Sequence, residues 1–113
     1  MKLVNVIELV KAKLVSGELK MKSIDKVFCS DLMSDVLTID TEKLLLITGM
    51  ANVQTIRTAE MADIHAILLV RNKKATPEML QLAIENKMVI METSISMFYS
   101  AGLLYEAGLK PVY

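Results

Sequence analysis

The sequence predicts an α/β domain of three layers, in which a mainly parallel central sheet of about four strands is flanked by helices. Continuous short apolar runs are typical of strands buried on both faces. Three such runs occur, at KLLLITG (43–49), HAILLV (65–70) and MVIME (88–92). Each run is followed by a polar turn and a segment with helical periodicity. Three consecutive strand–turn–helix units imply parallel strands joined by right-handed crossovers.

Length and composition favour one domain over residues 1–113, because 113 residues is close to the usual domain size. The apolar fraction is 53% and nine residues are Met. Such a composition predicts a sheet covered on both faces, or an apolar patch left over for a partner. We therefore expect self-association, most simply as a symmetric homodimer.

The charge balance excludes some partners. Thirteen Lys and Arg residues balance thirteen Asp and Glu residues, and there is no Trp. A phosphate backbone needs a basic face and bases need aromatic side chains to stack on, so no nucleic acid binding is expected. The N-terminal apolar pattern is interrupted by charges, and no uncharged stretch is long enough to cross a membrane. We expect a cytoplasmic protein.

The N-terminal segment has the apolar spacing of an amphipathic helix. The apolar positions are Leu3, Val6, Ile7, Val10 and Leu14. This pattern predicts a first helix that ends near Ser16-Gly17, and SGELKMKS (16–23) is then a loop or a short strand.

The next two segments are short. IDKVFCS (24–30) alternates and is predicted to be a strand, and SDLMSDVL (30–37) is predicted to be a short helix. Ser30 or Asp31 would be the N-cap of that helix, because a hydroxyl or carboxylate oxygen can accept from the free N–H groups of the first turn.

The segment LLLITGMANVQTIRTAEM (44–61) contains a strand, a Thr-Gly turn and the start of a helix. Asn52 is the predicted N-cap of a helix over 51–63. Val53, Ile56 and Ala59 then point inward.

The last two helices follow polar segments. After the polar loop 71–75, Thr76-Pro77-Glu78 supplies a capping hydroxyl, a proline at the first helical position and an acid in the first turn. That helix is predicted to run to about Asn86. Thr93 or Ser94 is predicted to cap the final helix ISMFYSAGLLYEAG (95–108), which Gly108 and then Pro111 would end.

A ligand of an open parallel sheet binds outside the carboxyl ends of the strands. The loops 48–52, 70–74 and 92–96 are predicted to meet there, and 29–31 would end a further strand on the same side. Hydroxyls, N–H groups at helix starts and basic side chains suit a small anion. The candidate ligand-binding residues are Thr48, Gly49, Met50, Ala51, Asn52, Arg71, Thr93, Ser94 and Ser96. The alternative stays open that these residues only turn the chain and cap helices, since neither a Walker A motif nor GxGxxG occurs.

The sequence supports neither catalysis nor a metal site, and no catalytic residue, cofactor or metal is expected. His65 is the only histidine and precedes a strand, at the end opposite the candidate loops. Cys29 is the only cysteine, has no nearby histidine to activate it and is predicted to be a spectator thiol. Asp31 and Asp35 lie four residues apart and could bind a cation, but a cap plus an exposed acid is the alternative.

Three stretches together resemble the DRTGG domain family, which is related to the N-terminal domain of HPr serine kinase/phosphatase. They are SDLMSDVL (30–37), LLLITGMANVQTIRTAEMADIHAILLV (44–70) and KKATPEMLQLAIENKMVIMETSISMFYSAGLLYEAGL (73–109). The resemblance covers nearly the whole chain. The Asp-Arg and Thr-Gly-Gly for which the family is named are not recognisable here, and 21–27 contains no glycine.

The resemblance implies a small α/β domain that regulates or accompanies other proteins. Family members occur fused to CBS pairs, to pyrophosphatase and phosphotransacetylase modules, and as stand-alone bacterial proteins, some encoded beside iron-only hydrogenase components. In fused members the domain is associated with adenine-nucleotide regulation and dimerisation. Two hypotheses follow: a non-catalytic regulatory homodimer that binds a small anion such as an adenine nucleotide, or an accessory module that docks a partner enzyme, for example of a redox or hydrogenase system, and binds no small molecule.

Overall fold

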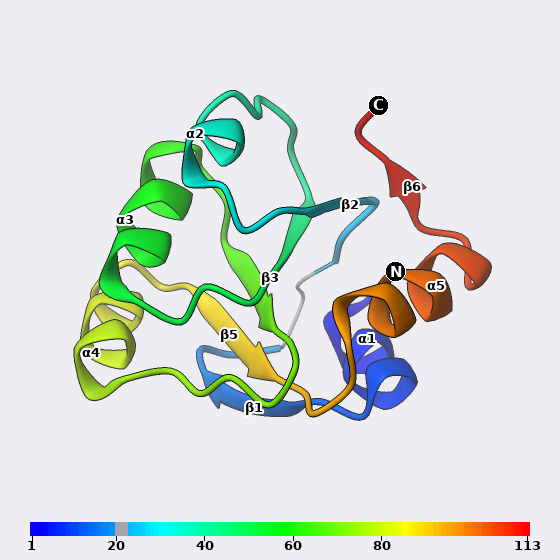
Figure 1. Cartoon of the computed structure of the whole chain (residues 1–113), viewed down its shortest axis with the longest axis horizontal. Coiled ribbons are helices and arrows are strands. Elements are labelled where there is room, and N and C mark those ends of the chain that lie inside the picture. Colours follow the sequence, from blue (N-terminus) through cyan, green and yellow to red (C-terminus); the bar gives the residue numbers. More distant parts are fainter. Residues whose placement is uncertain (20–22) are drawn as a thin grey trace.

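The computed structural model describes residues 1–19 and 23–113, which form a six-stranded sheet with helices on both faces (Figure 1). The strand order is β1-β5-β4-β3-β2-β6. The strands are β1 (Lys13–Ser16), β2 (Lys26–Cys29), β3 (Leu44–Thr48), β4 (Ala66–Leu69), β5 (Val89–Glu92) and β6 (Lys110–Pro111). The helices are α1 (Leu3–Val10), α2 (Met33–Val36), α3 (Val53–Met61), α4 (Pro77–Glu85) and α5 (Met97–Glu106). The predicted fold class is confirmed, and the two edge strands β1 and β6 are additional to the prediction.

The three predicted apolar strands lie at the centre of the sheet. β3, β4 and β5 are parallel and buried along their whole length. Alternate side chains point to opposite faces: Leu46 and Ile67 pack in the core beneath α2, α3 and α4, whereas Leu45 and Leu68 pack beneath α1 and α5. Burial on both faces explains why these strands are continuously apolar.

The first helix is shorter than predicted. It ends at Val10, because Lys11 adopts a left-handed conformation (φ 53°) and the N–H of Ala12 donates to the carbonyl of Ile7. Leu14 therefore lies in β1, which pairs antiparallel with the edge of β5. Its helical spacing was misleading, because pairing with a strand far along the chain decides its conformation. In the predicted segment 16–23, Ser16 ends β1, and residues 20–22 lie outside the described part of the chain.

The predicted caps of α3 and α4 are confirmed, and the cap of α2 is wrong. Asn52 accepts from the N–H of Thr55 at 3.0 Å, and Thr76 accepts from the N–H of Met79 at 3.1 Å. The N-cap of α2 is Leu32, whose side chain makes no capping hydrogen bond. Ser30 does not cap it, because its hydroxyl accepts from the N–H of Leu32, before the first turn. Asp31 does not cap it, because its carboxylate accepts from Thr48 and Gly49 at the end of β3.

The cap of α5 is Ser96, which accepts from the N–H of Tyr99 at 3.0 Å, and the prediction of Thr93 or Ser94 is wrong. Thr93 does not cap the helix, because its hydroxyl donates to the carbonyl of Val10. Gly108 follows α5 with φ 110°, a left-handed conformation that a glycine adopts without strain. The chain then reaches β6 beside β2.

The connections place a topological switch point between β4 and β5. The helices α2, α3 and α4, which link β2 to β5 in order, cover one face of the sheet. The helix α5, which follows β5, covers the other face with α1. The chain therefore leaves β4 and β5 in opposite directions, and the crevice that such a divergence opens at the carboxyl ends is the usual ligand position of an open α/β sheet.

Candidate functional site at the carboxyl ends of the strands

A carboxylate from the β2–α2 loop lies at the end of β3. Oδ1 of Asp31 accepts from Oγ1 of Thr48 at 2.9 Å and from the N–H of Gly49 at 2.6 Å. The hydroxyl of Thr48 in turn accepts from the N–H of Met50 at 3.1 Å. The donors predicted to bind a ligand anion thus hold the anionic side chain of Asp31. This role of Asp31 cannot be predicted from the sequence, because only the pairing of β2 with β3 brings the two loops together.

The loop after β4 is tied to the loop after β5. Arg71 and Asn72 both have a left-handed backbone, with φ of 56° and 61°. The N–H of Arg71 donates to the carbonyl of Ile95 at 2.9 Å, and that of Asn72 to the carbonyl of Thr93 at 3.0 Å. These bonds span the switch point and hold the two loops together, so the second and third predicted loops do converge.

The side chain of Arg71 reaches back toward β3. A Cβ atom at Gly49 would lie 3.2 Å from Nη2 of Arg71 and 3.5 Å from each carboxylate oxygen of Asp31. The loops after β2, β3 and β4 therefore meet at Gly49, and a side chain there would press on the guanidinium. The guanidinium itself is on an exposed residue, so it can reach a ligand.

The hydroxyls of the β5–α5 loop have different surroundings. Thr93 is buried, and its Oγ1 donates to the carbonyl of Val10 at 2.7 Å and accepts from the N–H of Ile95 at 3.3 Å. The hydroxyl of Ser96 caps α5. Ser94 is exposed. The hydroxyl of Thr93 thus helps to attach α1 to the sheet. Ser94 and Ser96 are both exposed, and Ser94 is the one whose hydroxyl does not cap the helix.

A second carboxylate, which the sequence analysis did not single out, lies at the end of β5. Glu92 is only 8% exposed, and its Oε2 accepts from the N–H of Ala75 at 2.7 Å. Its Oε1 lies 3.6 Å from Nζ of Lys74, an exposed side chain whose pairing contributes little in water. Glu92 orders the start of α4 and its loop. The feature of the sequence that could have indicated this role is the position of Glu92, an acidic residue at the end of an otherwise apolar strand.

The surface formed by the loops at the carboxyl ends of the strands therefore carries charges of both signs. The carboxylates of Asp31 and Glu92 are engaged by backbone N–H groups. The basic side chains of Arg71, Lys73 and Lys74 belong to exposed residues. Such an arrangement suits a ligand that carries both an anionic group and neutral hydrogen-bond donors.

The remaining reactive groups are a histidine at the opposite end of the strands and a cysteine that borders a separate groove. His65 lies before β4, at the amino end of the strand, with Nε2 2.9 Å from Oδ1 of Asp63, and both residues are exposed. Cys29 is an exposed residue at the carboxyl end of β2, and one side of it borders an apolar groove of about 320 Å³ beneath α5. Desolvation there raises the pKa of the Cys29 thiol, which opposes a role as a nucleophile. Within residues 1–19 and 23–113, no three metal-ligating side chains come together, and no helix is long and apolar enough to cross a membrane.

The fold is a mixed α/β domain with a mostly parallel sheet, and it is shared with a known regulatory region. A crystal structure of the CBS and DRTGG domains of the regulatory region of Clostridium perfringens pyrophosphatase, complexed with the activator diadenosine tetraphosphate, is similar with a TM-score of 0.73. The sequence identity is 14%, and the similarity covers 96% of this chain and 47% of that one, so our chain spans about half its length.

At this identity the similarity shows the fold alone. No family model matches the sequence, and no curated protein matches it in a sequence comparison. The shared architecture supports the DRTGG-like fold implied by the resemblance. Membership of that family stays a prediction.

Proposed function

We propose that the protein is a non-catalytic regulatory domain that binds a small anionic ligand, such as an adenine nucleotide, at the carboxyl ends of β3, β4 and β5. The observation that carries the proposal is the guanidinium of Arg71, positioned over Gly49 by a loop that is bonded to Ile95. The similar structure is a regulatory region complexed with a dinucleotide activator, which supports a ligand of this chemistry.

The ligand would not displace the carboxylate of Asp31 from Thr48 and Gly49, and would bind on the solvent side of that carboxylate. A phosphate group would contact Arg71 and the first turn of α3, where the N–H groups of Val53 and Gln54 have no intrahelical partner. A ribose hydroxyl would donate to Oδ2 of Asp31. In this arrangement Thr48 and Gly49 form the floor of the site, and Met50–Asn52, Ser94 and Ser96 line its sides.

Binding can be measured by thermal shift with a panel of AMP, ADP, ATP and diadenosine tetraphosphate. A nucleotide at a hundred times its dissociation constant is expected to stabilise the fold by about 2.7 kcal/mol. Arg71→Asn removes the positive charge and keeps a residue type that tolerates the left-handed backbone, so it should weaken binding at least about tenfold, equivalent to about 1.4 kcal/mol.

Arg57→Gln is the matched control, because it removes an exposed guanidinium from α3 rather than from the site loops. It should bind as the parent does. If no nucleotide in the panel stabilises the parent, the nucleotide proposal is wrong. If Arg71→Asn binds as tightly as Arg57→Gln, the site assignment is wrong.

We also propose that two copies associate through α5. Phe98 is 89% exposed and Tyr105 is 69% exposed, and they border the same groove as the small residues Ala101 and Gly102. Exposed aromatic side chains around a small-residue centre allow a second α5 to approach closely in a symmetric dimer.

Sedimentation velocity at micromolar concentration tests the dimer. Within the described residues, a Cβ at Gly102 would have no atom within 4 Å beyond the adjacent backbone of α5, so Gly102→Lys should be tolerated by one copy and block the approach of another. The parent and Gly102→Ala are expected to sediment as dimers, and Gly102→Lys as a monomer. A parent that is only monomeric, or a Gly102→Lys variant that stays dimeric, would contradict the interface.

A further inference from the structure

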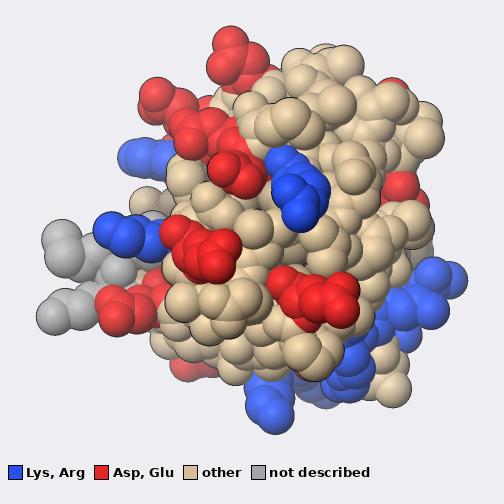
Figure 2. All heavy atoms as spheres, turned by 90° about the vertical axis from the view of Figure 1, so that its left-hand side faces the viewer, with Lys and Arg blue, Asp and Glu red and all other residues tan. Residues whose placement is uncertain are grey.

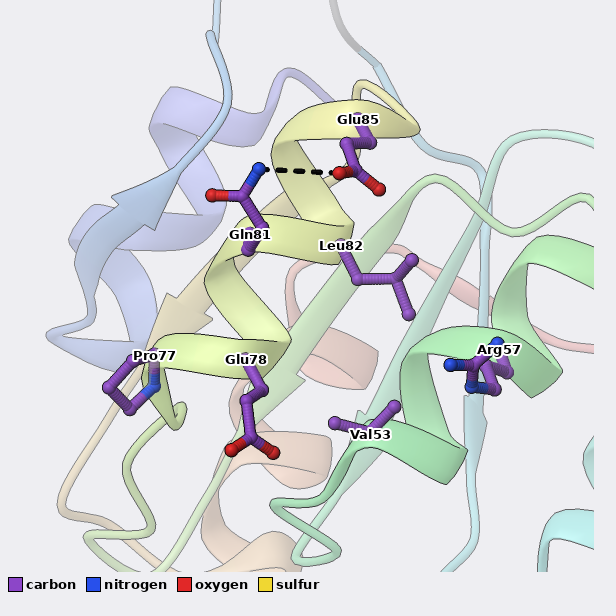
Figure 3. Close-up of a pocket in the computed structure, with 7 residues that line it drawn as sticks. All are labelled: Val53, Arg57, Pro77, Glu78, Gln81, Leu82 and Glu85. Carbon is purple, nitrogen blue, oxygen red and sulfur yellow. Dashed lines mark hydrogen bonds between the residues drawn. The ribbon is translucent and has the colours of Figure 1, made fainter.

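A groove separates the two longest helices on the face of the sheet opposite α1 and α5. It lies between α3 and α4 and has a volume of about 470 Å³ (Figure 3). Val53 from α3 and Leu82 from α4 point toward each other at its floor. Glu78 and Glu85 stand along the α4 side, and Arg57 stands on the α3 side. The groove thus has an apolar floor and a charged rim.

The helices of this face are acidic, although the whole chain is neutral. α2, α3 and α4 carry one basic residue, Arg57, and four acidic residues, for a net charge of −3. The acidic residues, all exposed, are Asp35, Glu60, Glu78 and Glu85. Figure 2 looks onto this side of the molecule, where acidic side chains are spread over a largely uncharged surface, with one basic side chain near the centre and further basic side chains toward the margins. Because the chain has no net charge, the rest of it carries the compensating positive charge.

We propose that this groove docks an amphipathic helix of a partner protein, with apolar residues on one face and Lys or Arg residues on its flanks. Its apolar face would pack on Val53 and Leu82, and its basic flanks would pair with Glu78 and Glu85. α3 and α4 have nine residues each, so each is about 13 Å long and the groove accommodates two to three helical turns.

A second copy of the chain does not supply such a helix. Among the helices of the described residues, α1 and α5 contain neither Lys nor Arg, and the only basic helical residue is Arg57 in the groove itself. An acidic rim also repels nucleic acid and anionic membranes. The charge pattern therefore favours a helix of a different protein. This inference concerns another face of the molecule and does not rest on the proposed ligand site.

The test uses the whole chain and a designed peptide. The peptide has about 14 residues, near the length at which isolated helices begin to form, with Leu at helical spacing on one face and Lys on the flanks. A fluorescent derivative is titrated with the protein and followed by anisotropy. We expect saturable binding that weakens as salt is added. A peptide with the same composition in scrambled order, and one with Glu in place of Lys, are expected not to bind.

A pair of double variants locates the binding. Glu78→Gln with Glu85→Gln should weaken binding about fivefold or more, as expected for the loss of two partly exposed ion pairs. Glu8→Gln with Glu106→Gln changes the net charge by the same amount on α1 and α5, and should leave affinity within about twofold. Circular dichroism confirms that both variants fold.

Three results would overturn the proposal. The first is equal binding by the two double variants, and the second is equal binding of the Lys and Glu peptides. The third is a change in the monomer–dimer equilibrium of the protein alone when Glu78 and Glu85 are neutralised, which would make the groove an interface between copies of this chain.

Discussion

The ends of β3 and β5 use the same side chain in different ways. Each strand end has one buried threonine. Thr48 is the last residue of β3, and Thr93 follows the last residue of β5. The hydroxyl of Thr48 donates to a carboxylate on an exposed loop residue, Asp31. The hydroxyl of Thr93 donates to the backbone carbonyl of Val10, with both partners buried. Thr48 thus bonds to a solvent-accessible loop, whereas Thr93 attaches the end of α1 to the sheet.

The difference bears on where a ligand can act. The carboxylate of Asp31 has solvent as an alternative hydrogen-bonding partner, so the β3 end can rearrange around a ligand at low cost. The carbonyl of Val10 has no such alternative, because a buried acceptor that loses its donor keeps the full desolvation penalty. We therefore expect the hydrogen bonds at the end of β3 to rearrange when a ligand binds, and those at the end of β5 to stay as they are.

The largest expected effect distinguishes the two threonines directly. Thr93→Val preserves the shape of the side chain and leaves the carbonyl of Val10 without its donor, so it should lower the free energy of unfolding by about 2 kcal/mol. Thr48→Val should lower it by about 1 kcal/mol, because Asp31 keeps its bond to Gly49 and is accessible to water. Urea denaturation of both variants measures the difference. Equal losses, or a larger loss for Thr48→Val, would remove the contrast between the two strand ends.

A smaller effect separates the serines of the β5 loop. Ser96→Ala removes the N-cap of α5 and should cost about 1 kcal/mol of stability. Ser94→Ala changes an exposed hydroxyl and should stay within about 0.5 kcal/mol of the parent. Thermal unfolding of the two variants compares them. A loss in Ser94→Ala equal to that in Ser96→Ala would mean that the helix begins earlier than the structure shows.

The smallest expected effect is a pH dependence of stability from Cys29, which lies at the end of β2 and borders the groove under α5. Its pKa is raised by desolvation, so the folded chain holds the proton at a pH where the unfolded chain releases it. Stability should therefore fall slightly as the pH rises past the ordinary pKa of a thiol. Because Cys29 is exposed, reagent can reach it in the folded chain, and alkylation by iodoacetamide at pH 8 should be only modestly slower in the folded protein than in urea. An alkylation profile with its midpoint at or below the ordinary thiol value would contradict this.

Local chemistry was sufficient to predict several elements. The caps Asn52 and Thr76 each bond to an N–H three residues along the chain, so the interaction is contained in a short stretch of sequence. The strands β3, β4 and β5 were evident because burial on both faces demands an uninterrupted apolar run. The convergence of the loops after β3, β4 and β5 also followed from the parallel arrangement, and the structure has Arg71 at their meeting point.

Two of the errors, at Leu14 and at Asp31, share a physical cause. Leu14 continues a helical pattern, but Lys13–Ser16 forms a strand because it pairs antiparallel with β5. Asp31 is a good local cap, but the donors of Thr48 and Gly49 compete successfully for its carboxylate. In each error the winning partner is distant in sequence, 17 positions away for Asp31 and Thr48.

The sequence by itself determined the α/β class, the central parallel strands and the caps of α3 and α4, because these depend on apolar periodicity and on hydrogen bonds within one turn. Only the tertiary structure decided the strand order, the two edge strands and the acceptors of the Thr48 and Thr93 hydroxyls at the carboxyl ends of the strands. Those partners are up to 83 positions apart, as for Thr93 and Val10, so no local pattern encodes them. The physical reason is that a hydroxyl or carboxylate bonds to whichever donor or acceptor the packed chain brings within about 3 Å.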